Sequence, residues 1–485
     1  MLFNSYEFIF VFLPIVFIVY FLLNKLSNSI YSKVWLVTCS LFFYSWWNVA
    51  YLPLIVGSLI FNFIVGTLLV NGNIKRNKLL LTFGILINVF LLGYFKYADF
   101  FIANINTLFE NDYNLLHLVL PLAISFFTFQ QIAYLVDSYR REYDGYNFLD
   151  YSLFVTFFPQ LIAGPIVHHK EMMPQFETKE NKKIDLRNIS LGMFIFFIGL
   201  FKKVVIADSF AVWATKGFDE PYTLTFFEGW LTSLSYTMQL YFDFSGYCDM
   251  AIGAALLFNI RLPLNFNSPY KSLDIQDFWR RWHMTLGRFL TKYLYIPLGG
   301  NRQGELRTYV NILTIFLISG LWHGAGWTFV FWGFLHGLAT VIHRIWKRFG
   351  YTMNKYIAWF ITFNFVNIAW VFFRANSWAD AERVLTAMIG LNGFSLPEIY
   401  ITVFEKITTI NVDIGTTFFL KGLIEPTEAF LYTAVFLLVV VSTKNSFERM
   451  NNFKGTTKES IWLAITTAIA IMSLTKVSEF LYFNF

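Results

Sequence analysis

Residues 54–70 read LIVGSLIFNFIVGTLLV, a run of apolar side chains that contains no charged residue. As a helix, such a run is long enough to cross most of the hydrocarbon core of a bilayer, which is about 30 Å thick. Several comparable runs are short or interrupted. The pattern therefore predicts an all-α integral membrane protein in which roughly 10–13 helices cross or re-enter the bilayer. The other runs lie at 7–23, 34–50, 79–94, 115–136, 151–167, 190–207, 224–242, 247–258, 309–321, 327–342, 357–373, 428–441 and 461–474.

The composition also indicates that lipid surrounds the protein. Of the 485 residues, 56% are hydrophobic and only 14% are charged, whereas soluble chains contain about 25% charged residues. Cys39 and Cys248 both lie in apolar surroundings, so a disulfide framework is not expected. The net charge of +6 comes from Lys and Arg in short loops between apolar runs. This pattern is typical of a membrane protein and does not indicate a nucleic-acid partner.

Charged loops predict an orientation for the first half of the chain. Lys and Arg occupy the connections at 25–33, 75–78 and 140–141, whereas 98–114 contains Glu110 and Asp112 but no Lys or Arg. The three basic loops are expected in the cytoplasm and the N-terminus in the periplasm. The first run lacks a basic start and a cleavage site, so we expect it to be retained. Because no period of about 20–50 residues repeats, we treat 1–485 as one membrane domain and not as a transporter of duplicated halves.

The segment 259–307 interrupts the apolar pattern and is expected to be interfacial or re-entrant. If residues 275–292 form one helix, one face contains Arg281, Arg288 and Lys292 and another contains Trp279 and His283. A basic stripe beside a Trp-rich stripe is typical of a helix in the membrane interface. Arg281 and Arg288 are therefore candidates for binding the phosphates of a coenzyme or lipid. Anchoring to lipid head groups explains the pattern equally well.

The main candidate for chemistry is His323, in the region 308–343. It lies in SGLWHGAGW, residues 319–327, between two apolar runs. An ionisable side chain inside a membrane costs free energy, so its presence there suggests a functional site. The glycines around it, including Gly324, leave room for a substrate, and Trp322 and Trp327 are expected to exclude water from the site. A neutral imidazole there can accept a proton from a hydroxyl group. The alternative is a buried histidine with a structural role.

Further polar residues in apolar surroundings are weaker candidates. His283 is the second candidate for catalysis. Asp243 and Asp249 are expected to pair with basic residues of the segment that follows them, or to line a polar cavity. Gln160, beside a probable helix break, is expected to shape the pocket. No metal site is expected, because neither Cys nor a carboxylate completes a set of metal ligands with His336 and His343. The sequence also lacks a G-x-S-x-G motif for a serine nucleophile and a phosphate-binding G-x-x-x-x-G-K-[ST] loop.

Longer motifs resemble a known family. The sequence LWHGAGW at 321–327, continuing to FWG at 331–333, resembles the catalytic-histidine motif of the membrane-bound O-acyltransferase family. A second hallmark of that family is similar to NSPY, FWRRWH and YIPLGGNR, at 267–270, 278–283 and 295–302. The alginate O-acetylation branch is similar in four further places: MLFNS at 1–5, FFPQLIAGPI at 157–166, WVFFRA at 370–375 and FLYFNF at 480–485.

The resemblance implies a ring of tilted helices around a funnel, with His323 as the catalytic histidine and His283 as the family's second histidine. It implies a multi-pass protein of the bacterial inner membrane, surrounded by lipid and without a bound cofactor. Acetyl would pass from cytoplasmic acetyl-coenzyme A, through a periplasmic partner protein, to an alginate-like polysaccharide or to peptidoglycan. Transfer of D-alanyl groups to a cell-envelope polymer is the alternative within the family. The residues alone also leave open a glycan flippase or channel without chemistry, and an assembly scaffold.

Overall fold

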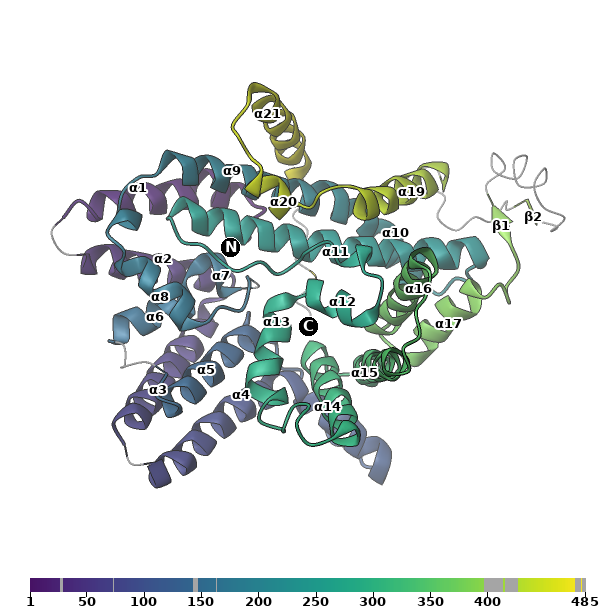
Figure 1. Cartoon of the computed structure of the whole chain (residues 1–485), viewed down its shortest axis with the longest axis horizontal. Helices are drawn as coiled ribbons and strands as arrows, with labels where there is room; N and C mark the ends of the chain where they lie inside the picture. The colour runs from purple at the N-terminus through teal and green to yellow at the C-terminus, as the bar shows by residue number, and fades with distance from the viewer. Residues whose placement is uncertain are drawn as a thin grey trace.

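The computed structural model describes residues 1–26, 29–72, 74–142, 147–162, 164–396, 413–414, 426–475 and 481. This part of the chain is helical, apart from a parallel pairing of β1 (Ser395–Leu396) with β2 (Asp413–Ile414) (Figure 1). The prediction of an all-α membrane protein is thus confirmed. Of the motif at 480–485 only Leu481 lies within the described residues. The stretches long and apolar enough to cross a membrane are Val49–Asn71, Asn77–Phe109, Leu186–Asp219 and Lys355–Arg374, with shorter apolar helices at Glu7–Leu23 and Glu428–Ser442.

Most helices follow the predicted apolar runs. The first part of the chain forms η1 (Glu7–Phe12), α1 (Leu13–Leu23), α2 (Ile30–Ser45), η2 (Val49–Tyr51), α3 (Leu52–Asn71), α4 (Ile74–Phe109), α5 (Ile124–Tyr139), α6 (Phe148–Thr156), α7 (Phe158–Leu161), α8 (His169–Glu177), η3 (Glu180–Lys182), α9 (Leu186–Phe201), the π-helix η4 (Lys202–Ala207), α10 (Asp208–Asp219) and α11 (Phe226–Leu257). The remainder forms η5 (Pro269–Lys271), α12 (Ile275–Arg281), α13 (Met284–Leu290), the π-helix η6 (Thr291–Tyr295), α14 (Glu305–His323), α15 (Trp327–Arg348), α16 (Lys355–Arg374), α17 (Trp378–Met388), α19 (Pro426–Ser442), α20 (Ser446–Asn451), α21 (Thr457–Met472) and η7 (Ser473–Thr475).

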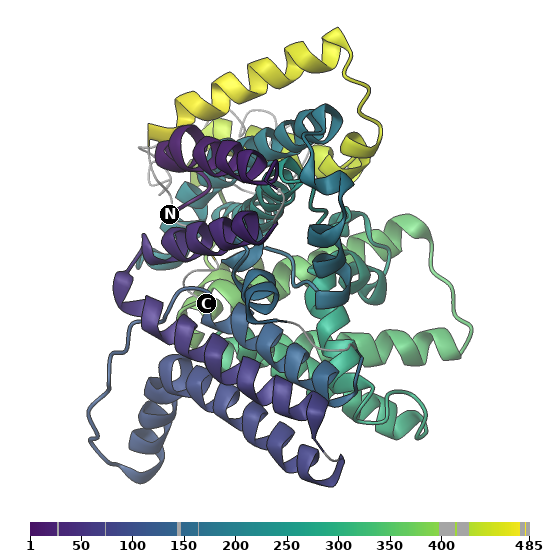
Figure 2. The same cartoon turned by 90° about the vertical axis from the view of Figure 1, so that its left-hand side faces the viewer.

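The two predicted runs at 224–242 and 247–258 form one helix, α11. Its 32 residues extend about 48 Å at 1.5 Å per residue, so it must tilt to fit a bilayer. α9 and α11 lie side by side in the middle of the molecule (Figure 1). Their backbones approach closely, because a Cβ atom on Gly199 would lie 2.5 Å from the carbonyl oxygen of Gly246. α21 packs against α9 at one end of the molecule (Figure 2).

The single helix expected over residues 275–292 is wrong. α12 ends at Arg281, and α13 begins at Met284, because His283 has a left-handed backbone conformation with φ 44°. Asn265 stabilises this break: its backbone oxygen accepts a hydrogen bond from the Met284 amide at 3.0 Å, and its side-chain oxygen accepts one from the Thr285 amide at 3.2 Å. The two predicted stripes therefore do not lie on a common helix. The helix expected from residue 115 also starts late, at Ile124.

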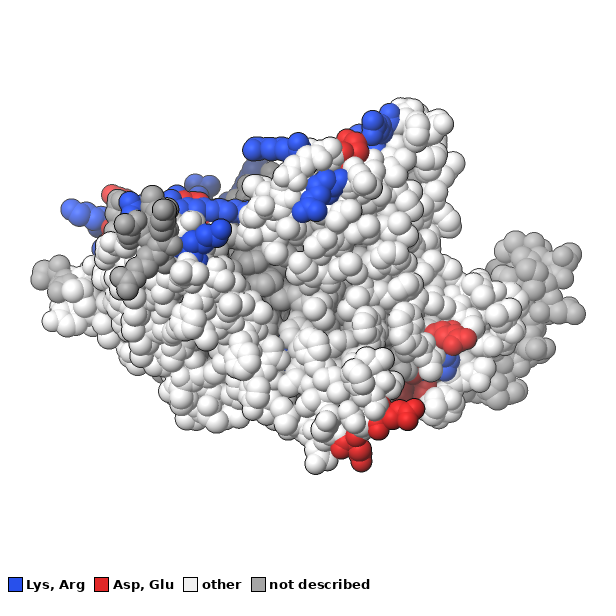
Figure 3. Space-filling model, turned by 90° about the horizontal axis from the view of Figure 1, so that it is seen from below, with Lys and Arg blue, Asp and Glu red and all other residues white. Residues whose placement is uncertain are grey.

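Charge divides the molecular surface into two edges. Figure 3 shows most Lys and Arg along one edge, Asp and Glu along the opposite edge, and an uncharged band between them. The ends of the long helices agree with this division: α4 starts beside Lys78 and ends beside Glu110, and the continuous stretch α9–η4–α10 runs from Arg187 to Asp219. The side with Lys78 and Arg187 is called the basic edge below, and the side with Glu110 and Asp219 the acidic edge.

Candidate active site

His323 is the last residue of α14, and its side chain is buried, with 2% of the residue exposed. Aromatic rings from two further helices surround the imidazole. The ring centroids of Trp332 on α15 and Phe373 on α16 lie 5.2 and 5.1 Å from that of His323. The ring of Trp322 is 4.8 Å away. The imidazole is therefore held in a buried, largely aromatic environment.

His283 lies next to His323, although the two residues are 40 positions apart in the sequence. The centroids of the two imidazoles are 6.4 Å apart, and His283 is also buried. Its Nδ1 lies 3.2 Å from the side-chain oxygen of Asn265. With the proton on Nδ1, the imidazole donates to Asn265, and Nε2 is then the basic nitrogen. The left-handed turn between α12 and α13 is what places this side chain beside α14.

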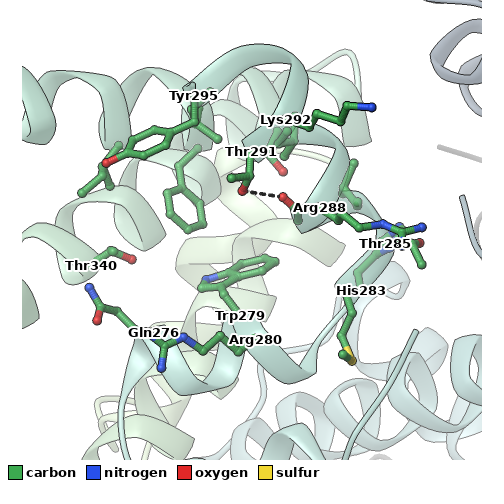
Figure 4. A pocket seen from close by; sticks show the side chains of 18 of the residues that line it. Gln276, Trp279, Arg280, His283, Thr285, Arg288, Thr291, Lys292, Tyr295 and Thr340 are labelled. Atoms are coloured by element: carbon green, nitrogen blue, oxygen red, sulfur yellow. Dashed lines mark hydrogen bonds between the residues drawn. The ribbon is translucent and has the colours of Figure 1, made fainter. Parts of the chain in front are cut away.

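A cavity of about 930 Å³ opens beside the two histidines. His283 and Ser319 both line it, and Ser319 lies one helical turn before His323. Figure 4 shows Trp279 in the middle of this cavity, with side chains of α12, α13 and η6 around it. We call it the basic cavity, because four cationic side chains line it: Arg280, Arg288, Lys292 and Arg344. Arg344 is near the end of α15 that carries Lys347 and Arg348, which places the mouth of the cavity toward the basic edge.

A second cavity, of about 310 Å³, lies on the other side of His323. Gly324 and Ala325, which follow the histidine directly, line it together with Lys96 and Asp99 of α4. Leu118, from the connection that contains the acidic residues after α4, also lines this small cavity and places it toward the acidic edge. His323 itself lines neither cavity, but residues before and after it in the chain line one cavity each, so the buried imidazole lies between two cavities that face opposite edges of the protein.

The structure changes the roles expected for residues around His323. Trp327 is 56% exposed and donates a hydrogen bond from Nε1 to Asn104 at 2.8 Å, so it does not enclose the histidine. The buried Trp332 does so instead. Gly324 does not leave space for a substrate at its own Cα, because a Cβ atom there would clash with the ring of Phe329. This glycine allows α15 to pack closely against the end of α14.

Of the two arginines predicted to bind phosphate, only Arg288 lines the basic cavity, where it also contacts Glu171 at 2.6 Å. Arg281 forms an ion pair with Asp277 at 2.9 Å, on the same helix and away from the cavity lining. Its neighbour Arg280 lines the cavity instead. The break at His283 accounts for this difference, because it changes the rotation of α12 relative to α13.

Asp243 and Asp249 are buried, but the predicted partners in the segment after them are wrong. Asp243 pairs with Lys203 at 2.7 Å, and Asp249 pairs with Lys202 at 2.8 Å. Both lysines belong to the π-helix η4, which packs on α11. Gln160 is buried and donates to the backbone oxygen of Phe154 at 2.5 Å, so it stabilises the break between α6 and α7.

Three groups of important residues were not anticipated: Asn265, the pair Lys202 and Lys203, and Lys96. The lysines carry a recognisable signal, since each is a charged residue within a long apolar helix. Asn265 carries no such signal in the sequence, because its role in stabilising the turn at His283 depends on the fold around it. Among the described residues, no group of three His, Cys, Asp or Glu side chains is arranged to hold a metal ion. His336 accepts a hydrogen bond from Trp279 at 3.2 Å.

An all-helical membrane protein that buries two histidines beside a large basic cavity is organised as a membrane-embedded enzyme. The family model of the membrane-bound O-acyltransferases matches residues 70–378, and the chain belongs to this family. It is therefore an acyltransferase. It is 49% identical to the peptidoglycan O-acetyltransferase of Helicobacter pylori, an alignment that covers 100% of this chain and 98% of the relative. It is 36% identical to the probable alginate O-acetylase AlgI of Pseudomonas putida, over 100% of both chains. A teichoic acid D-alanyltransferase of Streptococcus thermophilus is 27% identical and aligns with 48% of this chain and 59% of its own length.

Proposed function

We propose that this protein acetylates peptidoglycan, with acetyl-coenzyme A as the donor. The observation that carries the proposal is the position of His323 and His283 between a basic cavity and a small cavity that face opposite edges. We expect the donor to approach such a site from one cavity and the acceptor from the other. The full-length similarity to a peptidoglycan O-acetyltransferase supports this acceptor. The lower identity to an alginate O-acetylase makes a secreted polysaccharide the second candidate.

The charge distribution supports an orientation. Cytoplasmic surfaces of membrane proteins are enriched in Lys and Arg, so the basic edge faces the cytoplasm of the bacterium and the chain lies in its inner membrane. The basic cavity then takes up the donor from the cytoplasm. Its cations, among them Arg280 and Arg288, are suited to the phosphates of a coenzyme. The small cavity receives the acceptor from the periplasm, and a partner protein there passes the acetyl group on to the glycan.

The chemistry is a direct transfer in which His323 acts as the general base. Its imidazole takes the proton of an acceptor hydroxyl, whose oxygen attacks the carbonyl carbon of the thioester. The C–S bond then breaks, and the thiolate of the coenzyme receives the proton from the imidazolium. Positioned proton transfer of this kind contributes about 10²–10⁴-fold to a rate. His283, oriented by Asn265, lies at the wall of the basic cavity and positions the thioester there.

The test is the amount of acetate released by mild base from isolated sacculi and from secreted glycans. Wild-type cells are compared with cells that express His323→Ala at the same level. His343→Gln is the matched control, because this histidine lies away from both cavities. We expect ester acetate to disappear from sacculi in His323→Ala cells only. Loss of ester acetate from secreted glycan alone would identify a polysaccharide acceptor. Loss of ester-linked D-alanine would identify the acyl group of the more distant relative. Unchanged acetate in every fraction would refute an acetyltransferase.

A further inference from the structure

Lys96 lies deep in the apolar helix α4, within FLLGYFKYADFF at residues 90–101. Burying an ammonium group in a membrane-crossing helix costs free energy, so we expect a specific partner for Lys96. The partner is the end of α14. Lys96 Nζ donates hydrogen bonds to the backbone oxygens of Trp322 and, at 3.2 Å, of His323. It also lies 5.8 Å above the ring of Trp322.

These contacts complete the end of α14. The last four carbonyl groups of an α-helix have no partner within the helix. Here the oxygen of Gly320 accepts from the amide of Gly324 at 3.3 Å, and that of Leu321 accepts from the hydroxyl of Tyr97 at 2.7 Å. Lys96 satisfies the remaining two. Lys96 and Tyr97, neighbours on α4, thus donate hydrogen bonds to three of the last four carbonyl groups of α14, including that of His323.

The positive charge adds to the hydrogen bonds. The C-terminal end of a helix has a partial negative charge, which an ammonium group stabilises. Lys96 also lines the small cavity together with Gly324, so the charge lies on the side of His323 that faces the acidic edge. A lysine at this place fixes the backbone from which the imidazole projects.

We propose that Lys96 is a positioning residue for acyl transfer, which keeps the imidazole of His323 in place between the two cavities. The proposal rests on the function proposed above, in which His323 is the base. A displacement of a reacting group by about 1 Å lowers a rate about 100-fold, so a change confined to the end of α14 is sufficient to lower turnover strongly. Donor binding in the basic cavity, on the other side of the histidine, is not affected.

The test uses purified full-length protein in detergent, with acetyl-coenzyme A as donor and a short N-acetylglucosamine oligomer, in place of the partner protein, as the probe that supplies the acceptor hydroxyl. Release of the coenzyme thiol gives kcat, and KM for acetyl-coenzyme A. Lys96→Met removes the ammonium group, and Lys96→Gln keeps donor hydrogens without the charge. Lys96→Arg keeps the charge and the donors. Lys78→Met changes an exposed lysine of the same helix and is the matched control.

We expect Lys96→Met and Lys96→Gln to lower kcat about 100-fold with unchanged KM, and Lys96→Arg to recover most of the rate. Lys78→Met should retain kcat. All variants are compared at equal amounts of monodisperse protein. If His323→Ala is inactive while folded Lys96→Gln has the wild-type kcat, the role of Lys96 is refuted and the proposed function stands. An equal loss in Lys96→Gln and Lys78→Met would also refute it, as would a raised KM with unchanged kcat. An active His323→Ala protein would refute both proposals.

Discussion

Lys203 forms a buried ion pair whose loss should destabilise the protein strongly. Its side chain and that of Asp243 are 3% and 2% exposed, and Nζ and Oδ1 are 2.7 Å apart. Asp208 also contacts Lys203, at 2.9 Å, but its side chain is 22% exposed. Replacing Lys203 with Met leaves the carboxylate of Asp243 buried without its cation. Replacing Asp243 with Asn leaves Lys203 with Asp208, so we expect the smaller loss for Asp243→Asn.

Removing one partner of a buried ion pair costs about 3–5 kcal/mol. At about 2.1 cal/mol/K of unfolding entropy per residue, a change of 1 kcal/mol shifts the unfolding midpoint of a chain of 485 residues by about 1 °C, so Lys203→Met should lower the midpoint by about 3–5 °C. The double variant Lys203→Met/Asp243→Leu removes both charges and should recover most of this loss, because well-packed apolar side chains can replace a buried pair. Asp277→Asn breaks the half-exposed pair with Arg281, which is worth about 0.3–0.5 kcal/mol, and serves as the control.

The measurement is the fraction of monodisperse protein that remains after heating in detergent, followed by size-exclusion chromatography. The reasoning requires the order Lys203→Met, then Asp243→Asn, then Asp277→Asn, from the largest loss to the smallest. A Lys203→Met protein with the wild-type midpoint would refute it. So would a double variant that is less stable than both single variants, because the cost would then come from packing and not from an uncompensated charge.

Three further predictions concern packing, donor binding and pH. Gly333→Ala should lower both the unfolding midpoint and turnover, because the added Cβ atom would clash with a backbone oxygen of α14. Gly93→Ala should change neither, because nothing lies within 4 Å of the added Cβ atom. The midpoint is measured by heating and turnover by release of the coenzyme thiol. Arg280→Gln should raise KM for acetyl-coenzyme A about tenfold or more, as expected for one lost charge-assisted hydrogen bond, and Arg281→Gln should leave KM unchanged. Burial lowers the pKa of His169 to about 4, against the opposing charge of Asp137. In the unfolded chain the imidazole of His169 has a pKa of about 6.5, so as the pH falls the unfolded state binds the proton before the folded state does. This histidine's contribution to stability is therefore present above pH 6.5 and is lost toward pH 4. Midpoints at pH 7 and pH 5 should differ less in His169→Gln than in wild type.

The sequence alone was sufficient for the features that depend on local chemistry. Apolar runs predict membrane helices because lipid solvates each helix separately, and an imidazole between two such runs is unusual wherever it occurs. His323 could therefore be proposed without a structure, whereas Trp332, which encloses it in place of Trp327, could not. The division into a basic and an acidic edge follows from the ends of the same runs.

The features that the sequence did not predict depend on distant contacts. The left-handed conformation of His283 is held by Asn265, which carries no signal of this role. The partners of Asp243 and Asp249 depend on the packing of η4 against α11, whereas the prediction placed them in the segment that follows the two carboxylates. The polar residues in the middle of α11 suggested two helices, but Asp243 and Asp249 pair with lysines of η4 inside the protein and do not interrupt the helix.

The position of His323 between the two cavities also determines the electrical work of the reaction. Moving one elementary charge through a membrane potential of 100 mV requires about 2.3 kcal/mol. In the proposed reaction the phosphates of the coenzyme stay with the cations of the basic cavity. The acetyl group passes to the acceptor and the proton of the acceptor hydroxyl passes to the coenzyme thiol, so no net charge changes sides. Export of acetyl in this form is electrically silent. The supply of acetyl groups to the cell envelope would then continue in cells whose membrane potential has collapsed, for as long as the cytoplasm contains the thioester.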